Sequence, residues 1–172
     1  MEKLVVIVFP NGLQGQIWAA ILRSQNLSVI WESPDVVLPQ ILKNLHERQA
    51  LPDLLILDTR LHHLQPYRLC RWRQRHRLDT QILLVNGAQL QIIPAERQWA
   101  LTQAAVDLLP RISKQALVSG AATNLRHVLD VLNVRSCNQQ AMVRALLRMG
   151  LGMPAQRSHP KVSRVLKAHS YQ

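Results

Sequence analysis

The first 110 residues alternate between short continuous apolar runs and longer segments whose apolar residues recur every three or four positions. Short runs rich in Val, Ile and Leu are typical of strands buried on both faces of a sheet. Recurrence at three or four positions is typical of amphipathic helices. The runs predict five strands, at residues 3–9, 27–31, 53–58, 80–86 and 106–110. The other segments predict helices at residues 13–25, around 41–45, 66–78 and 94–105.

This alternation predicts the fold class. Strands that alternate with helices form a parallel sheet with helices on both faces, so we expect a doubly wound five-stranded α/β domain. In such a sheet, functional groups lie at the edge formed by the carboxyl ends of the strands. Asp58 ends the third apolar run and is therefore a candidate functional residue.

The pattern changes after Pro110, where helical spacing continues without further strands. Leu117, Ala121 and Leu125 share one face of a helix predicted at 113–133. A second helix is predicted at 138–149, with Val143, Leu146 and Leu147 directed inward, and a short basic helix follows the loop at 150–159. We therefore predict a domain at 1–133 and a basic helical extension at 134–172.

The charge of the chain is uneven. The net charge is +11, yet residues 1–110 hold 11 Lys and Arg against 9 Asp and Glu, while 111–172 hold 10 against Asp130 alone. Such asymmetry favours a polyanionic partner. The candidates are nucleic acid, an acidic protein face and a membrane surface.

Apolar run lengths and cysteine spacing indicate the cellular location of the protein. No apolar run approaches the roughly 20 residues of a membrane span, and the N-terminal run is too short for a secretory signal. Cys70 and Cys137 lie far apart in the sequence, which predicts reduced thiols in a cytoplasmic protein rather than a disulfide framework.

The order of five strands and five helices, with an aspartate ending the third strand, resembles the receiver domain of bacterial response regulators, the CheY-like fold. The resemblance covers about residues 3–133, and Asp58 stands at the position of the phosphorylated aspartate. It implies a domain of signal transduction.

The groups that support phosphorylation in this family are replaced here. Acidic residues that help hold Mg²⁺ follow the first strand in receivers, where this chain has Asn11. A Ser or Thr ends the fourth strand in receivers, where Asn86 stands. A lysine precedes the proline after the fifth strand in receivers, where Leu109 stands before Pro110 and Arg111 follows.

Phosphoryl transfer needs metal and cationic groups to neutralise charge, and a lone carboxylate would repel the donor. Asp58 is therefore interpreted as the polar end of a buried strand, in a pseudo-receiver that docks onto partner proteins without phosphorylation. A phosphorelay regulator phosphorylated at Asp58 is the alternative that the resemblance leaves open.

A second candidate site is the arginine-rich segment "RLCRWRQRHR". Its basic residues are Arg68, Arg71, Arg73, Arg75 and Arg77. On a helix, Arg68, Arg71 and Arg75 share one side beside Trp72, an arrangement that suits phosphate contacts and base stacking. The competing interpretation is a solvated helix face with Leu69 and Trp72 turned to the sheet.

The basic end of the chain adds Lys161, Arg164 and Lys167. The last two helices could form a helix-turn-helix, but the 150–159 connection is long for that motif. The alternative is a helix that docks on the domain or on a partner.

The sequence gives no sign of catalysis. His62 and His63 lack a third metal ligand at a suitable spacing, and Gly12 and Gly15 do not complete a nucleotide-binding motif. We therefore expect no cofactor, no metal and no enzyme activity. The sequence predicts a regulatory protein acting through protein contacts, with nucleic-acid binding as the alternative from another class.

Overall fold

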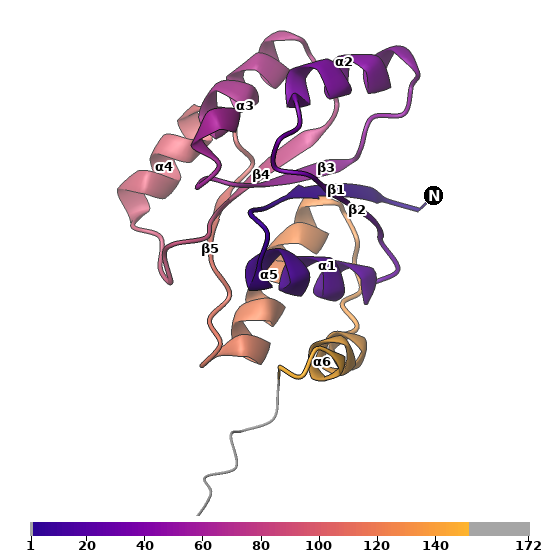
Figure 1. Cartoon of the computed structure of the whole chain (residues 1–172), viewed down its shortest axis with the longest axis vertical. Helices are drawn as coiled ribbons and strands as arrows, with labels where there is room; N and C mark the ends of the chain where they lie inside the picture. The colour runs from indigo at the N-terminus through magenta and orange to yellow at the C-terminus, as the bar shows by residue number, and fades with distance from the viewer. Residues whose placement is uncertain (1, 152–172) are drawn as a thin grey trace, which may run out of the picture.

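The computed structural model describes residues 2–151, which form one parallel sheet covered by helices on both faces (Figure 1). The strands are β1 (Leu4–Val8), β2 (Ser28–Glu32), β3 (Leu54–Asp58), β4 (Gln81–Asn86) and β5 (Leu108–Pro110). The helices are α1 (Leu13–Arg23), α2 (Leu38–Glu47), α3 (Pro66–Arg75), α4 (Pro94–Thr102), α5 (Leu117–Val131) and α6 (Gln139–Arg148), with a 3₁₀ turn, η1 (His62–Leu64). The strand order is β2-β1-β3-β4-β5, so the doubly wound five-stranded fold predicted from the sequence is confirmed.

The sheet separates two apolar clusters. Side chains alternate between the faces of a strand, so Val5 and Ile7 of β1 point to one face and Val6 and Val8 to the other. The first face is covered by α1, α5 and α6, and the second by α2, α3 and α4 (Figure 1). Strand β3 lies between β1 and β4 and is buried along its whole length.

Strand β2 departs from the expected pattern. It lies at one edge of the sheet and pairs only with β1, so its residues are half-buried and Ile30 is 45% exposed. The prediction that all five strands are buried was therefore wrong for β2. An apolar run does not show whether a strand has a neighbour on one side or on both.

Helix α6 packs against the domain. Asn138 caps its start by accepting a hydrogen bond from the backbone N–H of Ala141, at 2.9 Å. Met142 and Leu146 are buried in the same cluster as α1 and α5. The prediction that Leu147 points inward was wrong, because it lies about 100° around the helix from Leu146 and is 47% exposed.

Two predictions concern the C-terminal part of the chain. The domain boundary at residue 133 stays a prediction. The basic helix that follows residue 159, with Lys161, Arg164 and Lys167, lies outside the described residues. Within residues 2–151, no helix has the length and apolar character that crossing a membrane requires.

Candidate functional site

Asp58 lies at the carboxyl end of the central strand, where the fold places a functional group. It is the last residue of β3, opposite Val85 of β4, and its side chain is 0% exposed. A buried carboxylate is costly unless opposite charge or hydrogen bonds compensate it. The neighbours of its two oxygens therefore decide what it can do.

Arg60 occupies both oxygens of Asp58. Its Nε lies 3.1 Å from Oδ1 and 3.1 Å from Oδ2, and its Nη2 lies 2.7 Å from Oδ2. The backbone N–H of Arg60 also donates to Oδ1, at 2.9 Å. The side-chain hydrogen bonds to Asp58 raise the pKa of Arg60, against the smaller opposing effect of burial. The Arg60 guanidinium thus lies against both carboxylate oxygens, which are the atoms that a metal ion or a phosphoryl group would contact.

Gly87 closes the other side of this ion pair. It follows β4 and is buried. A methyl group on its Cα would overlap Oδ2 of Asp58 and the Nε and Nη2 atoms of Arg60. Only glycine allows the backbone to approach the pair so closely.

The sequence interpretation missed Arg60 and Gly87. A usable signal was present, because a basic residue two positions after the aspartate and a glycine after the next strand both fall at the same edge of the sheet. What the sequence could not show is that the Arg60 side chain turns back over Asp58.

Two of the three positions that differ from receivers, Asn86 and Leu109, have local structural roles. Asn11 is exposed in the loop after β1. Asn86 donates to Oε1 of Glu96 at 3.0 Å and accepts from the N–H of Ala88 at 3.1 Å. Leu109 is buried in the cluster under α1 and α5. The side-chain bonds of Asn86 therefore go to α4 and the following loop rather than to Asp58.

The other weak candidates also have structural roles. Gly15 packs directly under the indole of Trp31, which explains the glycine without a nucleotide. Nε2 of His63 lies 2.7 Å from the carbonyl oxygen of Pro34. In the part of the chain from Glu2 to Leu151, no three His, Cys, Asp or Glu side chains gather closely enough to hold a metal ion.

The arginine-rich segment divides into two groups. Arg71 hydrogen-bonds to Oε1 of Gln103, and Arg73 donates to the carbonyl of Thr80 at 2.5 Å and to Oε1 of Gln81 at 3.1 Å. These two arginines tie α3 to β4 and to the end of α4. Trp72 is half-buried against the cluster under α2 and α3.

The remaining arginines of that segment face solvent. Arg68 is exposed and donates to Oε1 of Gln65 at 3.0 Å, while Arg75 and Arg77 are exposed at the end of α3. Of the predicted face of Arg68, Arg71 and Arg75, only Arg68 and Arg75 are thus exposed, because Arg71 turns to Gln103.

A separate basic groove lies between α1 and α6. It has a volume of about 360 Å³ and is lined by Arg23, Arg144 and Arg148. Arg144 and Arg148 lie four residues apart and so share one face of α6. The sequence interpretation missed this groove, because Arg23 is distant in sequence from the other two.

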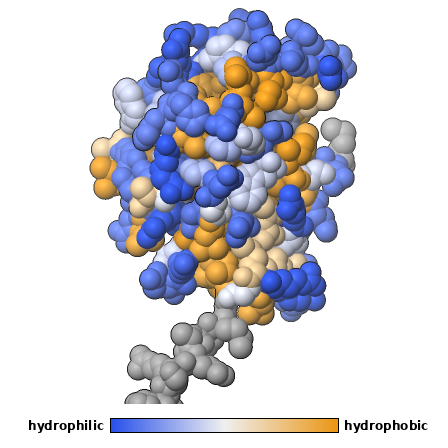
Figure 2. Space-filling view, in the orientation of Figure 1, coloured by the Kyte–Doolittle hydropathy of each residue, from blue (hydrophilic) through white to orange (hydrophobic). Residues whose placement is uncertain are grey.

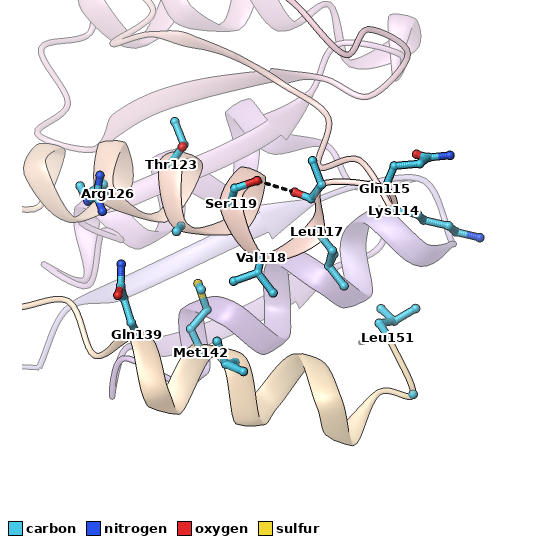
Figure 3. Close-up of a pocket in the computed structure, with 14 residues that line it drawn as sticks. Lys114, Gln115, Leu117, Val118, Ser119, Thr123, Arg126, Gln139, Met142 and Leu151 are labelled. Atoms are coloured by element: carbon cyan, nitrogen blue, oxygen red, sulfur yellow. Dashed lines mark hydrogen bonds between the residues drawn. The ribbon is translucent and has the colours of Figure 1, made fainter. Parts of the chain in front are cut away.

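A larger groove of about 930 Å³ runs between α5 and α6. In Figure 3, Val118 points from α5 toward α6 and Met142 points from α6 toward α5, while Lys114 and Gln115 lie at one end. Figure 2 shows apolar surface in this lower region of the molecule, among hydrophilic surface. The two helices therefore leave an open, partly apolar channel on the side of the sheet that α1 also covers.

Two solved structures that are similar to this chain are signal receiver domains. One, of NarL from Mycobacterium tuberculosis, matches with a TM-score of 0.51 at 20% identity, and the match covers 89% of this chain and 100% of that chain. Another, of a LuxO repressor protein from Vibrio parahaemolyticus, matches with a TM-score of 0.53 at 12% identity and the same coverage. The chain has the fold of a signal receiver domain. No protein-family model matches it, and no curated protein matches it.

Proposed function

We propose that this chain is a non-enzymatic regulatory protein, a pseudo-receiver that acts through protein contacts without phosphorylation of Asp58. The two similar structures are described as signal receiver domains, one of a response regulator and one of a repressor protein. A signalling role for this receiver-like fold rests on that likeness, and the mechanism rests on the surroundings of Asp58.

The observation that carries the proposal is the closed ion pair at the end of β3. An acceptor carboxylate must present one oxygen to the incoming phosphorus while Mg²⁺ and cations neutralise the developing charge. Both oxygens of Asp58 are bound by Arg60, and Gly87 packs against them. Displacing Arg60 would leave a buried carboxylate unpaired, which is strongly unfavourable.

Phosphorylation is tested with a small phosphodonor. The wild-type protein is incubated with acetyl phosphate and Mg²⁺, and the intact mass is measured. We expect no added phosphoryl group, and we expect Arg60→Ala, which uncovers Asp58, to be the variant most able to gain one. Stoichiometric labelling of the wild type that disappears in Asp58→Asn would overturn the proposal.

Protein contact is tested by charge reversal. Arg75 and Arg77 are exposed, so Arg75→Glu/Arg77→Glu should abolish recovery of a partner with an acidic face, while Asp58→Asn should leave recovery unchanged. Lys43→Glu/Arg48→Glu is the matched control, because these residues are also exposed and the net charge changes equally. Equal loss of partner recovery in both double variants would show that net charge alone explains the effect, and it would contradict a specific contact.

Nucleic-acid binding is a second candidate, and the groove of Arg23, Arg144 and Arg148 favours it. Lys and Arg contacts to phosphates release counterions, so affinity should fall steeply as salt rises. Arg144→Gln/Arg148→Gln should weaken binding and reduce the salt slope, by about one for each lost phosphate contact. Lys43→Gln/Arg48→Gln removes the same two positive charges from exposed positions elsewhere and should bind like wild type. An absence of retardation in gel shifts at low salt would exclude this function.

A further inference from the structure

A basic cleft lies beside the Asp58–Arg60 pair, at the edge where the strands end. Its volume is about 370 Å³. It is bounded by the loop after β1, the first turn of α1, the loop after β5, and Arg60 and Gly87. Ligands of doubly wound folds bind in the crevice outside the carboxyl ends of the strands, which is the position of this cleft. Its volume is at the lower end of the range for small-molecule sites.

The charged residues that line the cleft are all cations. Arg60, Arg111 and Lys114 line it, and none of its lining residues within 2–151 is an Asp or a Glu. Asp58 balances the charge of Arg60. Arg111 and Lys114 are exposed, and neither side chain has a hydrogen bond or an ion pair to another described residue. The cleft therefore holds two cations whose charge is not compensated locally.

The backbone that carries Arg111 is held in place. The side-chain amide of Gln14 donates to the carbonyl of Ile112 at 2.8 Å and accepts from its N–H at 2.9 Å. The N–H of Arg111 donates to the carbonyl of Gln89 at 2.9 Å, and Nδ2 of Asn124 donates to the carbonyl of Pro110 at 2.9 Å. A ligand would therefore find the backbone of Arg111 already ordered, which reduces the entropic cost of binding.

We propose that this cleft binds a small phosphomonoester or phosphate dianion noncovalently. The guanidinium of Arg111 can hold two phosphate oxygens and the ammonium of Lys114 a third, as these groups commonly do. Nη1 of Arg60 has no hydrogen bond to Asp58, because Nε and Nη2 make those contacts. The backbone N–H groups at the start of α1 add donors, but the cations define the site.

This proposal rests on the proposed function, since the cleft accepts a free dianion only while Asp58 carries no phosphoryl group. It adds a ligand to that function. A regulator that is not phosphorylated can still sense a phosphorylated metabolite at the same edge of the sheet, through Arg111 and Lys114 instead of through the aspartate.

The test titrates the full chain with inorganic phosphate and with phenyl phosphate in EDTA, where no Mg²⁺-dependent phosphorylation occurs. Backbone amide NMR shifts are followed, and we expect saturable shifts at Gly12, Leu13 and Gly87, with a dissociation constant on the order of 1 mM. Arg111→Gln/Lys114→Gln should weaken binding at least about tenfold, because charge-assisted hydrogen bonds are lost. Both residues are exposed, so the variant should fold.

The control is Arg75→Gln/Arg77→Gln, which removes the same charge from the end of α3 and should bind like wild type. Absence of saturable shifts, equal weakening by both double variants, or acetate binding as tightly as phosphate would each overturn the proposal. The proposed function fails by a different observation, which is covalent labelling of Asp58 in the presence of Mg²⁺. The two failures are therefore distinguishable.

Discussion

The guanidinium of Arg60 lies across the carboxylate of Asp58, with Nε 3.1 Å from each oxygen and Nη2 2.7 Å from Oδ2. Asp58 is fully buried, while the Arg60 side chain is 40% exposed. The arginine therefore covers a buried charge and carries its own outer surface in solvent. This contact covers the carboxylate at the end of β3, and in the proposed function it keeps Asp58 from accepting a phosphoryl group.

We expect Arg60→Ala to lower the free energy of unfolding by about 2–3 kcal/mol, because it leaves a buried carboxylate unpaired. The Asp58→Ala/Arg60→Ala double variant should lose less than the sum of the single variants, by about 1–2 kcal/mol. Urea unfolding of the four proteins measures this coupling. A coupling energy near zero would show that the pair contributes nothing to stability.

A second prediction concerns the glycine over this pair. Gly87→Ala should lower the free energy of unfolding by about 1–3 kcal/mol, because the added methyl group overlaps Asp58 and Arg60. Gly120→Ala in α5 is the control, since its methyl group would meet only ordinary contacts, at 3.7 Å from Ile112. There we expect a gain of about 0.5–1 kcal/mol from helix propensity. Equal effects at the two sites would contradict the packing of Gly87.

The fold could be predicted because its pattern is local. Each strand is a short apolar run, and Pro66 and Pro94 stand at the first positions of α3 and α4, where proline is favoured. Burial was harder to predict, because the exposure of β2 depends on which strands pair. The inward turn of Met142 in place of Leu147 depends on the rotation of α6 against α1 and α5.

The candidate site could be predicted only in part. Asp58 was found because it ends the third apolar run, but its contact with Arg60 depends on a side-chain conformation that sequence does not encode directly. The same limit applies to Arg71 and Arg73, whose contacts with Gln103 and Gln81 join α3 to the end of α4 and to β4. Charge patterns locate basic residues, whereas tertiary packing decides which of them remain available to a partner.

A third prediction concerns thiol reactivity. Burial raises the pKa of Cys70 to about 12, against the smaller opposing effects of Arg73 and Arg71. At pH 8 only about one Cys70 thiol in 10⁴ would then be ionised, and the thiolate is the reactive form. Iodoacetamide should therefore label the half-buried Cys137 in the native protein and Cys70 only after unfolding. Cys137→Ser should abolish native labelling, and native labelling that persists in this variant would contradict the burial of Cys70.

The last prediction concerns helix α6 and the domain boundary at residue 133. Met142 is fully buried among α1 and α5, so Met142→Ala should lower the free energy of unfolding by about 2–4 kcal/mol. Leu147→Ala removes an exposed side chain of similar size from the same helix, and we expect a change within about 0.5 kcal/mol.

Deleting the chain after residue 133 tests the boundary itself. The deletion removes both Met142 and Leu146 and exposes the apolar surface of α1 and α5 that they cover. Residues 1–133 should therefore be less stable in urea than residues 1–151, by more than Met142→Ala alone. Equal stability of the two fragments would show that the domain ends at residue 133 and that α6 only rests on its surface. A large difference would make α6 the sixth helix of the domain, and it would restrict the basic extension to the residues that follow it.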